Sequence, residues 1–210
     1  DGLKTSAIYG FISSLLKLIR EQKPEYVAII LDTKAKTFRH EEYRLYKAHR
    51  KPMPDDLSEQ ISPLYDILDT SNIKIYKKDG YEADDIIGTI TNQNYIKSLD
   101  LYMFSSDKDL MQLINENTFL YSPGNNFKPT KIYDKDSVVD RYGVAPSQFI
   151  DYLSLLGDTS DNIPGVKGVG AKTASKLIKS FGSLENIYNA IDEIDNPRIK
   201  NMLVNNKENA

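Results

Sequence analysis

The stretch IKIYKKDGYEADDIIGTITNQNYIKSLDLYMFSSDKDLMQLI, residues 73–114, alternates short strand-like segments with segments of helical periodicity. We expect strands at 73–76 and 99–106, and helices at 82–94 and 108–114. Strands that alternate with helices are typical of a parallel sheet covered by helices. The stretch therefore predicts an α/β fold.

The residues before this stretch continue the same alternation. Apolar residues recur at helical spacing in TSAIYGFISSLLKLI (5–19) and SEQISPLYDILDT (58–70), and YVAIIL (26–31) is a fully apolar run. A short apolar run of this kind is typical of a buried parallel strand. We therefore predict an α/β domain over residues 1–143, with a central, mostly parallel sheet flanked by helices.

Beyond Pro146 the strand-like segments stop. Three helical segments follow, SQFIDYLSLLG (147–157), AKTASKLIKSFG (171–182) and SLENIYNAI (183–191), and they are joined by glycine-containing loops. We predict a small all-α domain over residues 144–210, with the boundary near Gly143.

Composition narrows the possible classes of function. The chain has 210 residues, of which 40% are hydrophobic, and it contains no apolar run of about 18 residues that would predict a membrane span. The absence of cysteine excludes disulfides, thiolate catalysis and cysteine-bound zinc, and it agrees with a reducing compartment. The net charge of −3 by itself argues against a nucleic-acid partner, although the charge is unevenly distributed.

Acidic residues occur where predicted strands end or the next helices begin. In an open α/β sheet the carboxyl ends of the strands form the ligand crevice, so we expect these side chains to converge there. Eight carboxylates repel one another unless hard divalent cations such as Mg²⁺ lie between them, and pairs of such ions catalyse phosphoryl displacement. Taken singly, Asp32 is also explained as a turn or N-cap residue, the three acids at 82–85 as favourable charges at a helix N terminus, and Asp107 and Asp109 as caps. The candidate ligands are Asp32, Glu82, Asp84, Asp85, Asp107, Asp109, Asp158 and Asp161.

The segment GVKGVGAKTA, residues 165–174, matches a helix-hairpin-helix pattern. Its glycines permit a tight turn and bring backbone N–H groups to a phosphate at a helix N terminus. Such a cradle holds the nucleic-acid backbone without reading bases. The alternative is a helix C-cap followed by an amphipathic surface helix. The candidate DNA contacts here are Lys167, Gly168, Gly170, Lys172 and Thr173, and Lys176 and Lys179 add further positive charge.

A basic segment, KAKTFRHEEYRLYKAHRK (34–51), contains seven Lys or Arg residues and two Glu residues. Cations interleaved with aromatic rings are typical of a path for single-stranded nucleic acid, and Arg39, Tyr43 and Tyr46 are the candidate contacts. The alternative is a solvated, charged helix. Setting aside the eight negative charges of the predicted metal ligands changes the net charge from −3 to +5, so the rest of the chain is basic.

These residues resemble a known family in their order along the chain. AIYGF, LDTKAKTFRHEEYRLYKAHR, GYEADDIIG, SSDKDL and GDTSDNIPGVKGVGAKTA are similar to the 5′-nuclease domain of bacterial-type DNA polymerase I and to its flap-endonuclease relatives. The resemblance implies a PIN/5′-nuclease-like fold and a metal-dependent hydrolase that cuts DNA from the 5′ end and at single-strand/duplex junctions. It covers nearly the whole chain, and the last three motifs are highly specific.

The resemblance also implies roles for particular residues. Asp32, Glu82, Asp84 and Asp85 look like the ligands of one metal ion, and Asp107, Asp109, Asp158 and Asp161 like those of the other. Lys47 and Arg50 match the YKxxR basic pair of the family and are the candidate catalytic residues. The implied cofactors are two Mg²⁺ ions, for which Mn²⁺ can substitute, and K⁺ at the hairpin.

The expected partner is DNA with 5′ flaps or with 5′ ends at duplex junctions, bound by a monomer that works with a polymerase domain or subunit in replication and repair. The expected location is the cytoplasm or nucleoid, or else a DNA-containing organelle such as a plastid or mitochondrion. Two alternatives stay open: a non-catalytic junction-binding protein of the same fold, and a PIN-type ribonuclease.

One departure from the family concerns its first strand, which ends in an Asp of the metal site. Here DGLKTSAIYGF (1–11) aligns better with the later loop before the first helix, so Asp1 is not expected to be that ligand. We expect the strand and its Asp upstream of Asp1.

Overall fold

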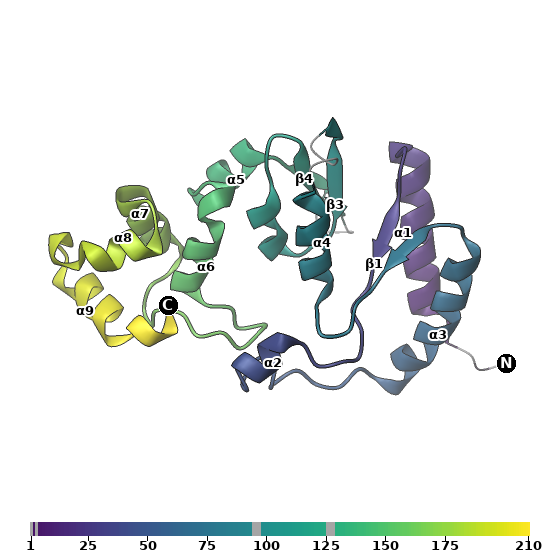
Figure 1. Cartoon of the computed structure of the whole chain (residues 1–210), viewed down its shortest axis with the longest axis horizontal. Coiled ribbons are helices and arrows are strands. Elements are labelled where there is room, and N and C mark those ends of the chain that lie inside the picture. Colours follow the sequence, from purple (N-terminus) through teal and green to yellow (C-terminus); the bar gives the residue numbers. More distant parts are fainter. Residues whose placement is uncertain (1, 3, 94–97, 125–128) are drawn as a thin grey trace. The chain divides into compact units, whose positions relative to one another are not determined.

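The computed structural model describes residues 2, 4–93, 98–124 and 129–210, and the chain divides into two compact units. Unit 1 comprises Asp1–Phe38 and Arg50–Ile86, and unit 2 comprises Arg39–His49 and Ile87–Ala210. Each unit contains a parallel pair of strands together with helices (Figure 1). The predicted α/β fold class is confirmed.

Unit 1 is built from two helices and two strands. Helices α1 (Ser6–Gln22) and α3 (Asp55–Thr70) pack together, and strands β1 (Ala28–Ile30) and β2 (Lys74–Tyr76) pair in parallel. The core of the unit is formed by Ile29, Leu64 and Leu68, against which apolar residues of α1 and β2 pack. The next helix, α4 (Ala83–Thr91), begins in unit 1 and continues in unit 2.

The buried Gln60 ties the two long helices of unit 1 together. Its Oε1 accepts a 2.8 Å hydrogen bond from the Ala7 N–H, and its Nε2 donates a 2.7 Å hydrogen bond to the Asp56 carbonyl. The first N–H groups of a helix have no acceptor within the helix. Gln60 of α3 therefore caps α1, which has no side-chain cap of its own at Thr5.

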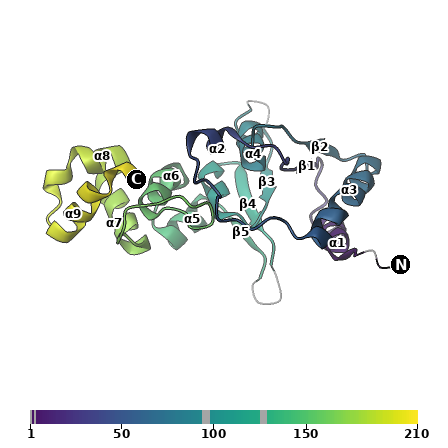
Figure 2. The same ribbon diagram turned by 90° about the horizontal axis from the view of Figure 1, so that it is seen from below.

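Unit 2 contains a three-stranded sheet (Figure 2). Strand β3 (Leu101–Phe104) pairs in parallel with β4 (Thr118–Ser122), which pairs in antiparallel fashion with β5 (Lys131–Tyr133). Strand β3 leads into the 3₁₀ helix η2 (Lys108–Leu113). The sequence analysis did not anticipate β4 and β5.

The remainder of unit 2 is helical. One hydrophobic core includes Leu120 of the sheet as well as Phe149, Ile178 and Leu203 of the helices, so both parts share it. The division predicted at residue 143 stays a prediction; Gly143 itself ends α5 with a left-handed φ of 73°. The helices are α2 (Phe38–Glu42, whose first residue belongs to unit 1), α5 (Lys135–Tyr142), η3 (Pro146–Gln148), α6 (Phe149–Leu156), α7 (Ala171–Phe181), α8 (Leu184–Asn189), η4 (Ile191–Glu193), α9 (Pro197–Asn205) and η5 (Lys207–Asn209).

Two expected helices differ from those observed. The helix expected at 82–94 ends at Thr91, and residue 94 lies outside the described residues. The helix expected at 108–114 is a 3₁₀ helix. At its start the Asp107 carboxylate accepts a hydrogen bond from the Asp109 N–H over 2.9 Å, so Asp107 caps this helix.

Candidate active site

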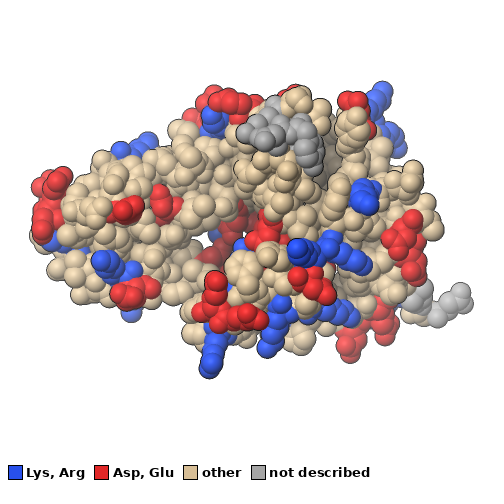
Figure 3. Space-filling view, viewed as in Figure 1, with Lys and Arg blue, Asp and Glu red and all other residues tan. Residues whose placement is uncertain are grey.

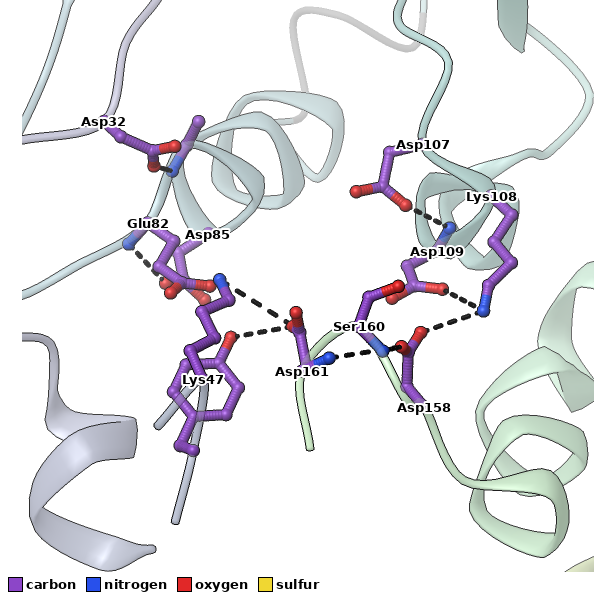
Figure 4. A network of polar contacts seen from close by, with 12 residues as sticks. Asp32, Lys47, Glu82, Asp85, Asp107, Lys108, Asp109, Asp158, Ser160 and Asp161 are labelled. Carbon is purple, nitrogen blue, oxygen red and sulfur yellow. Dashed lines mark hydrogen bonds and ion pairs between the residues drawn. The ribbon is translucent and has the colours of Figure 1, made fainter. Parts of the chain in front are cut away.

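Unit 1 gathers its candidate metal ligands at the beginning of α4. Asp32 follows β1, and its Oδ1 accepts a 2.7 Å hydrogen bond from the Ala83 N–H. The Glu82 N–H donates to Asp85 Oδ2 over 2.9 Å. Asp32, Glu82 and Asp85 therefore lie together (Figure 4), and Asp84 lies in the same first turn of α4. The positive end of the helix dipole favours negative charge at this position.

Unit 2 gathers three of the other candidates around Lys108, whereas the fourth, Asp161, pairs with Lys47. Asp107 and Asp109 follow β3, whereas Asp158 and Asp161 lie in the loop after α6. Lys108 Nζ donates a 2.8 Å hydrogen bond to Asp158 Oδ2 and lies 3.8 Å from Asp109 Oδ1 (Figure 4). The sequence analysis did not single out Lys108, although its position between two acids in SSDKDL is a signal for such a role.

The Asp109 carboxyl is the most perturbed group of this cluster. Burial raises its pKa to about 6, because the low-dielectric surroundings disfavour the charged form, and Lys108 opposes that shift. The neighbouring carboxylates Asp107, Asp158 and Asp161 raise the pKa further by repulsion. Its Oδ1 is buried and accepts no hydrogen bond. Lys108 therefore does not fully offset the burial of the Asp109 carboxyl and its repulsion by the neighbouring carboxylates.

The pKa of the Asp158 carboxyl is shifted in the opposite direction. Burial raises its pKa, but the Lys108 hydrogen bond and the loop N–H groups outweigh burial, so the pKa lies below its usual value. The N–H groups of Ser160 and Asp161 donate to Asp158 Oδ1 over 2.6 and 3.3 Å. The Asp158 side chain is therefore held ionised and fixed in orientation.

The backbone of residues 157–166, which we call the acidic loop, crosses itself at two glycines. Asp158 and Ile163 exchange two backbone hydrogen bonds of 2.8 Å and so close the loop. A Cβ atom on Gly157 or Gly165 would overlap the backbone of the other residue, and Gly157 has a left-handed φ of 71°. Glycine is required here because only it permits this approach. The crossing holds Asp158 and Asp161 on one short turn.

The candidate catalytic Lys47 contacts the acidic loop. Its Nζ lies 3.7 Å from Asp161 Oδ2, and its N–H donates to the Asp161 carbonyl over 2.9 Å (Figure 4). The Tyr46 hydroxyl donates to the same Asp161 oxygen over 3.1 Å. The Tyr46 ring packs edge-on against His40 and is only 5% exposed, which leaves little of it for base stacking in this conformation.

The remaining candidates of the basic segment are either exposed or half-buried. Arg39 of α2 and Tyr43 just beyond it are half-buried, and Arg50, which belongs to unit 1, is exposed. In the face shown in Figure 3, both basic and acidic side chains lie over α2. Within the basic segment, α2 covers five residues.

The hairpin contains both buried and exposed residues. Val166 and Val169 are buried, whereas Lys167, Gly168 and Gly170 between and after them are exposed. Gly168 has a left-handed φ of 92°. Gly170 is the N-cap of α7, and no side chain caps that helix. The N terminus of α7 can therefore accept an anion. Lys172, Lys176 and Lys179 are exposed on α7, and Thr173 is half-buried.

The donor set of unit 2 fits a divalent cation. Carboxylate oxygens are the ligands of Mg²⁺, and a buried carboxylate oxygen without a partner is unfavourable unless a cation binds it. The described parts of the chain contain no ready-made cluster of three or more carboxylates and histidines. In unit 2, Lys108 pairs with Asp158 and, over 3.8 Å, with Asp109, and Lys47 pairs with Asp161. The buried Asp109 Oδ1 accepts no hydrogen bond, so it is the atom of this set that a divalent cation would bind. None of the helices in the described ranges is long and apolar enough to cross a membrane.

Comparison with known proteins places the chain among nucleases. Residues 1–143 match the family model of the 5′-3′ exonuclease N-terminal resolvase-like domain, and residues 144–210 match that of the 5′-3′ exonuclease C-terminal SAM fold. DNA polymerase I of Caldicellulosiruptor bescii is 43% identical over 92% of this chain and 23% of its own length. The 5′-3′ exonuclease of Aquifex aeolicus is 40% identical over 89% of this chain and 63% of its own length.

Among solved structures, T5 5′-exonuclease with divalent metal ions (zinc) bound matches with a TM-score of 0.77 and 25% identity, over 99% of this chain and 79% of the T5 chain. The chain spans about a quarter of the length of the DNA polymerase I relatives. The two family models together cover the whole chain and follow the order of its motifs. The chain therefore belongs to the 5′-3′ exonuclease family.

Proposed function

We propose that the chain is a structure-specific 5′-nuclease that hydrolyses DNA phosphodiesters, both as a 5′-3′ exonuclease and as a 5′-flap endonuclease, in replication and repair. The observation that carries this proposal is the carboxylate set around Lys108, in which Asp158 is held ionised while a buried Asp109 oxygen lacks a hydrogen bond. Family membership supports a nuclease. Such a set has the charge and the ligand type of a centre for phosphoryl transfer.

We further propose that two divalent cations, Mg²⁺ or in its place Mn²⁺, serve the reaction. Asp32, Glu82, Asp84 and Asp85 would hold one ion, and Asp107, Asp109, Asp158 and Asp161 the other. The zinc-bound T5 5′-exonuclease supports divalent cations as the class of cofactor. When bound, the two ions activate a water and neutralise charge on the phosphate.

The basic pair Lys47 and Arg50 would contact the scissile phosphate. Water adds to the phosphorus, the bond to the 3′ oxygen breaks, and the product carries a 5′-phosphate. Negative charge on the phosphate oxygens increases toward the transition state, so cations aimed at them act mainly on the chemical step. The contacts of Lys47 with Asp161 keep its ammonium beside the carboxylates of unit 2.

The hairpin would hold the duplex through its phosphates. Lys167, Gly168, Gly170, Lys172 and Thr173 form the contact, with K⁺ as its further cofactor. Arg39 and Tyr43 would guide the single strand, and a stacking role of Tyr46 stays a prediction. The similarity to DNA polymerase I supports a polymerase domain or subunit as partner, and we propose a monomer that acts in the cytoplasm or nucleoid, or in a DNA-containing organelle.

The test is cleavage of a 5′-labelled flap DNA by the purified protein with Mg²⁺ and with EDTA. We expect cuts at the junction that need the metal ion, and products with 5′-phosphates. Tight flap binding without any cut would identify a non-catalytic junction-binding protein. Cleavage of an RNA flap but not of the DNA flap would identify a ribonuclease instead.

A further inference from the structure

The segment Leu45–Lys47 is fastened to the acidic loop by two backbone-directed hydrogen bonds. Asn162 Nδ2 donates to the Leu45 carbonyl over 2.7 Å, and the Lys47 N–H donates to the Asp161 carbonyl over 2.9 Å. Both partners belong to unit 2. Leu45 and Asn162 are 117 positions apart in the sequence, so the contact is purely tertiary.

The two ends of this fastening have unusual backbone conformations. Asn162 has a φ of 59° and Lys47 a φ of 54°, both in the left-handed region. Asparagine enters that region more readily than other non-glycine residues, whereas for lysine it is unfavourable and persists only where surrounding contacts enforce it. The conformation that directs the Lys47 side chain therefore depends on the loop that holds its neighbours.

We propose that Asn162 is a positioning residue for Lys47. Its amide holds the Leu45 carbonyl, and thereby keeps Lys47 in the left-handed conformation from which its ammonium reaches the Asp161 carboxylate. This inference rests on the proposed function, in which Lys47 contacts the scissile phosphate. Asn162 itself touches neither the metal ions nor the DNA in this assignment.

The chemistry of Asn162 allows a specific test. Asn162→Gly keeps the left-handed backbone available but removes the donor. Asn162→Asp keeps the size and the backbone preference, but its ionised carboxylate cannot donate to the Leu45 carbonyl. The two variants differ in charge and in backbone freedom, so an effect that they share reports the lost hydrogen bond.

Both variants should slow the single-turnover cleavage of a flap substrate by the full-length protein. Loss of one such hydrogen bond corresponds to a fall of roughly three- to tenfold. Flap affinity measured in Ca²⁺ should change by less than about twofold in Asn162→Gly, and so should the Mg²⁺ concentration for half-maximal rate, because this variant alters neither the hairpin nor the carboxylates.

The matched control is Asn186→Asp. Asn186 Nδ2 donates to the Phe181 carbonyl over 2.9 Å, so this variant loses the same kind of bond and adds the same charge outside the proposed site. Its single-turnover rate should equal that of the unmodified protein. A fall equal to that of Asn162→Asp would overturn the proposal.

A double-mutant cycle separates this inference from the proposed function. If Asn162 acts through Lys47, adding Asn162→Gly to Lys47→Ala should slow cleavage no further. Full additivity would overturn the positioning role while leaving Lys47 in place as a catalytic residue. An unchanged rate in Lys47→Ala would overturn both the inference and the role given to Lys47.

Amide hydrogen exchange gives a readout that needs no catalysis. Exchange at the Lys47 N–H should speed up in both Asn162 variants, while amides in the middle of α7 keep their rates. Unchanged exchange at Lys47 would overturn the proposal even in a protein that cuts no DNA. Faster exchange with an unchanged cleavage rate would overturn it as well, because the contact would then be structural only.

Discussion

The Lys108 ammonium donates a 2.8 Å hydrogen bond to the Asp158 carboxylate across 50 positions of sequence. Lys108 lies at the start of η2, just after β3, and Asp158 lies in the acidic loop. One side chain thus supplies a counter-charge for two acidic segments. That arrangement predicts how the protein responds when the charge is removed.

We expect Lys108→Met to destabilise the protein in EDTA by about 1 kcal/mol, a value that allows for the partial exposure of the ion pair. Mg²⁺ should reduce the loss, because a divalent cation among the carboxylates replaces the missing charge. The measurement is urea unfolding with and without Mg²⁺. Lys200→Met, which breaks an ion pair with Asp192, is the control and should show no dependence on Mg²⁺.

The raised pKa of Asp109 predicts a pH dependence of stability in EDTA. The folded pKa of about 6 exceeds the ordinary aspartate pKa of 3.8, so the folded protein binds the proton more tightly than the unfolded chain. The contribution of Asp109 to the free energy of unfolding is therefore fully present below about pH 4, and it is lost as the pH rises to about 6. Asp109→Asn should abolish this change and be more stable above pH 6 by about 1–2 kcal/mol, after discounting for partial exposure.

Unfolding free energies of both proteins between pH 4 and 7 test this prediction. The difference between them isolates Asp109 from Asp158, whose lowered pKa gives the opposite slope. Parallel pH profiles would show that Asp109 ionises normally.

Asp158→Asn should reduce single-turnover cleavage at least about a hundredfold, since loss of a metal ligand exceeds the effect of losing an outer contact. DNA affinity should be kept or should increase, because a negative charge near the phosphates is removed. Rates and gel-shift affinities check this. Asp192→Asn, on an exposed carboxylate elsewhere in unit 2, is the control. Undiminished cleavage by Asp158→Asn would contradict the ligand assignment.

Lys172→Ala should weaken duplex binding alike for all sequences and reduce the slope of log affinity against log salt by about one unit, as expected for one phosphate contact. Fluorescence anisotropy at several salt concentrations measures both. Lys135→Ala, which removes an exposed lysine outside the hairpin, should leave the slope unchanged. A sequence-selective loss for Lys172→Ala would argue against the cradle.

Much of this architecture follows from local sequence. The alternation of apolar runs with helical periods predicts the α/β class, and acids directly after strands predict where Asp32 and Asp107 lie. The role of Lys108 and the burial of Tyr46 depend on contacts with the acidic loop. In the case of Tyr46, that loop is more than a hundred residues away in the sequence. Local patterns do not contain such contacts.

The crossing of Gly157 and Gly165 has a consequence for where DNA is cut. The acidic loop ends at Val166, which is buried with Val169 in the core of unit 2. The chain then continues into α7. Asp158 and the hairpin are thus close in sequence and belong to the same unit. On the proposed function, the separation of the hairpin from Asp158 would fix how far from the bound duplex the DNA is cut. The position of the cut relative to the duplex should then be the same for flaps of different length. Gly165→Ala, which forces the crossing apart, should make the position of the cut less exact and spread the cuts over several neighbouring positions.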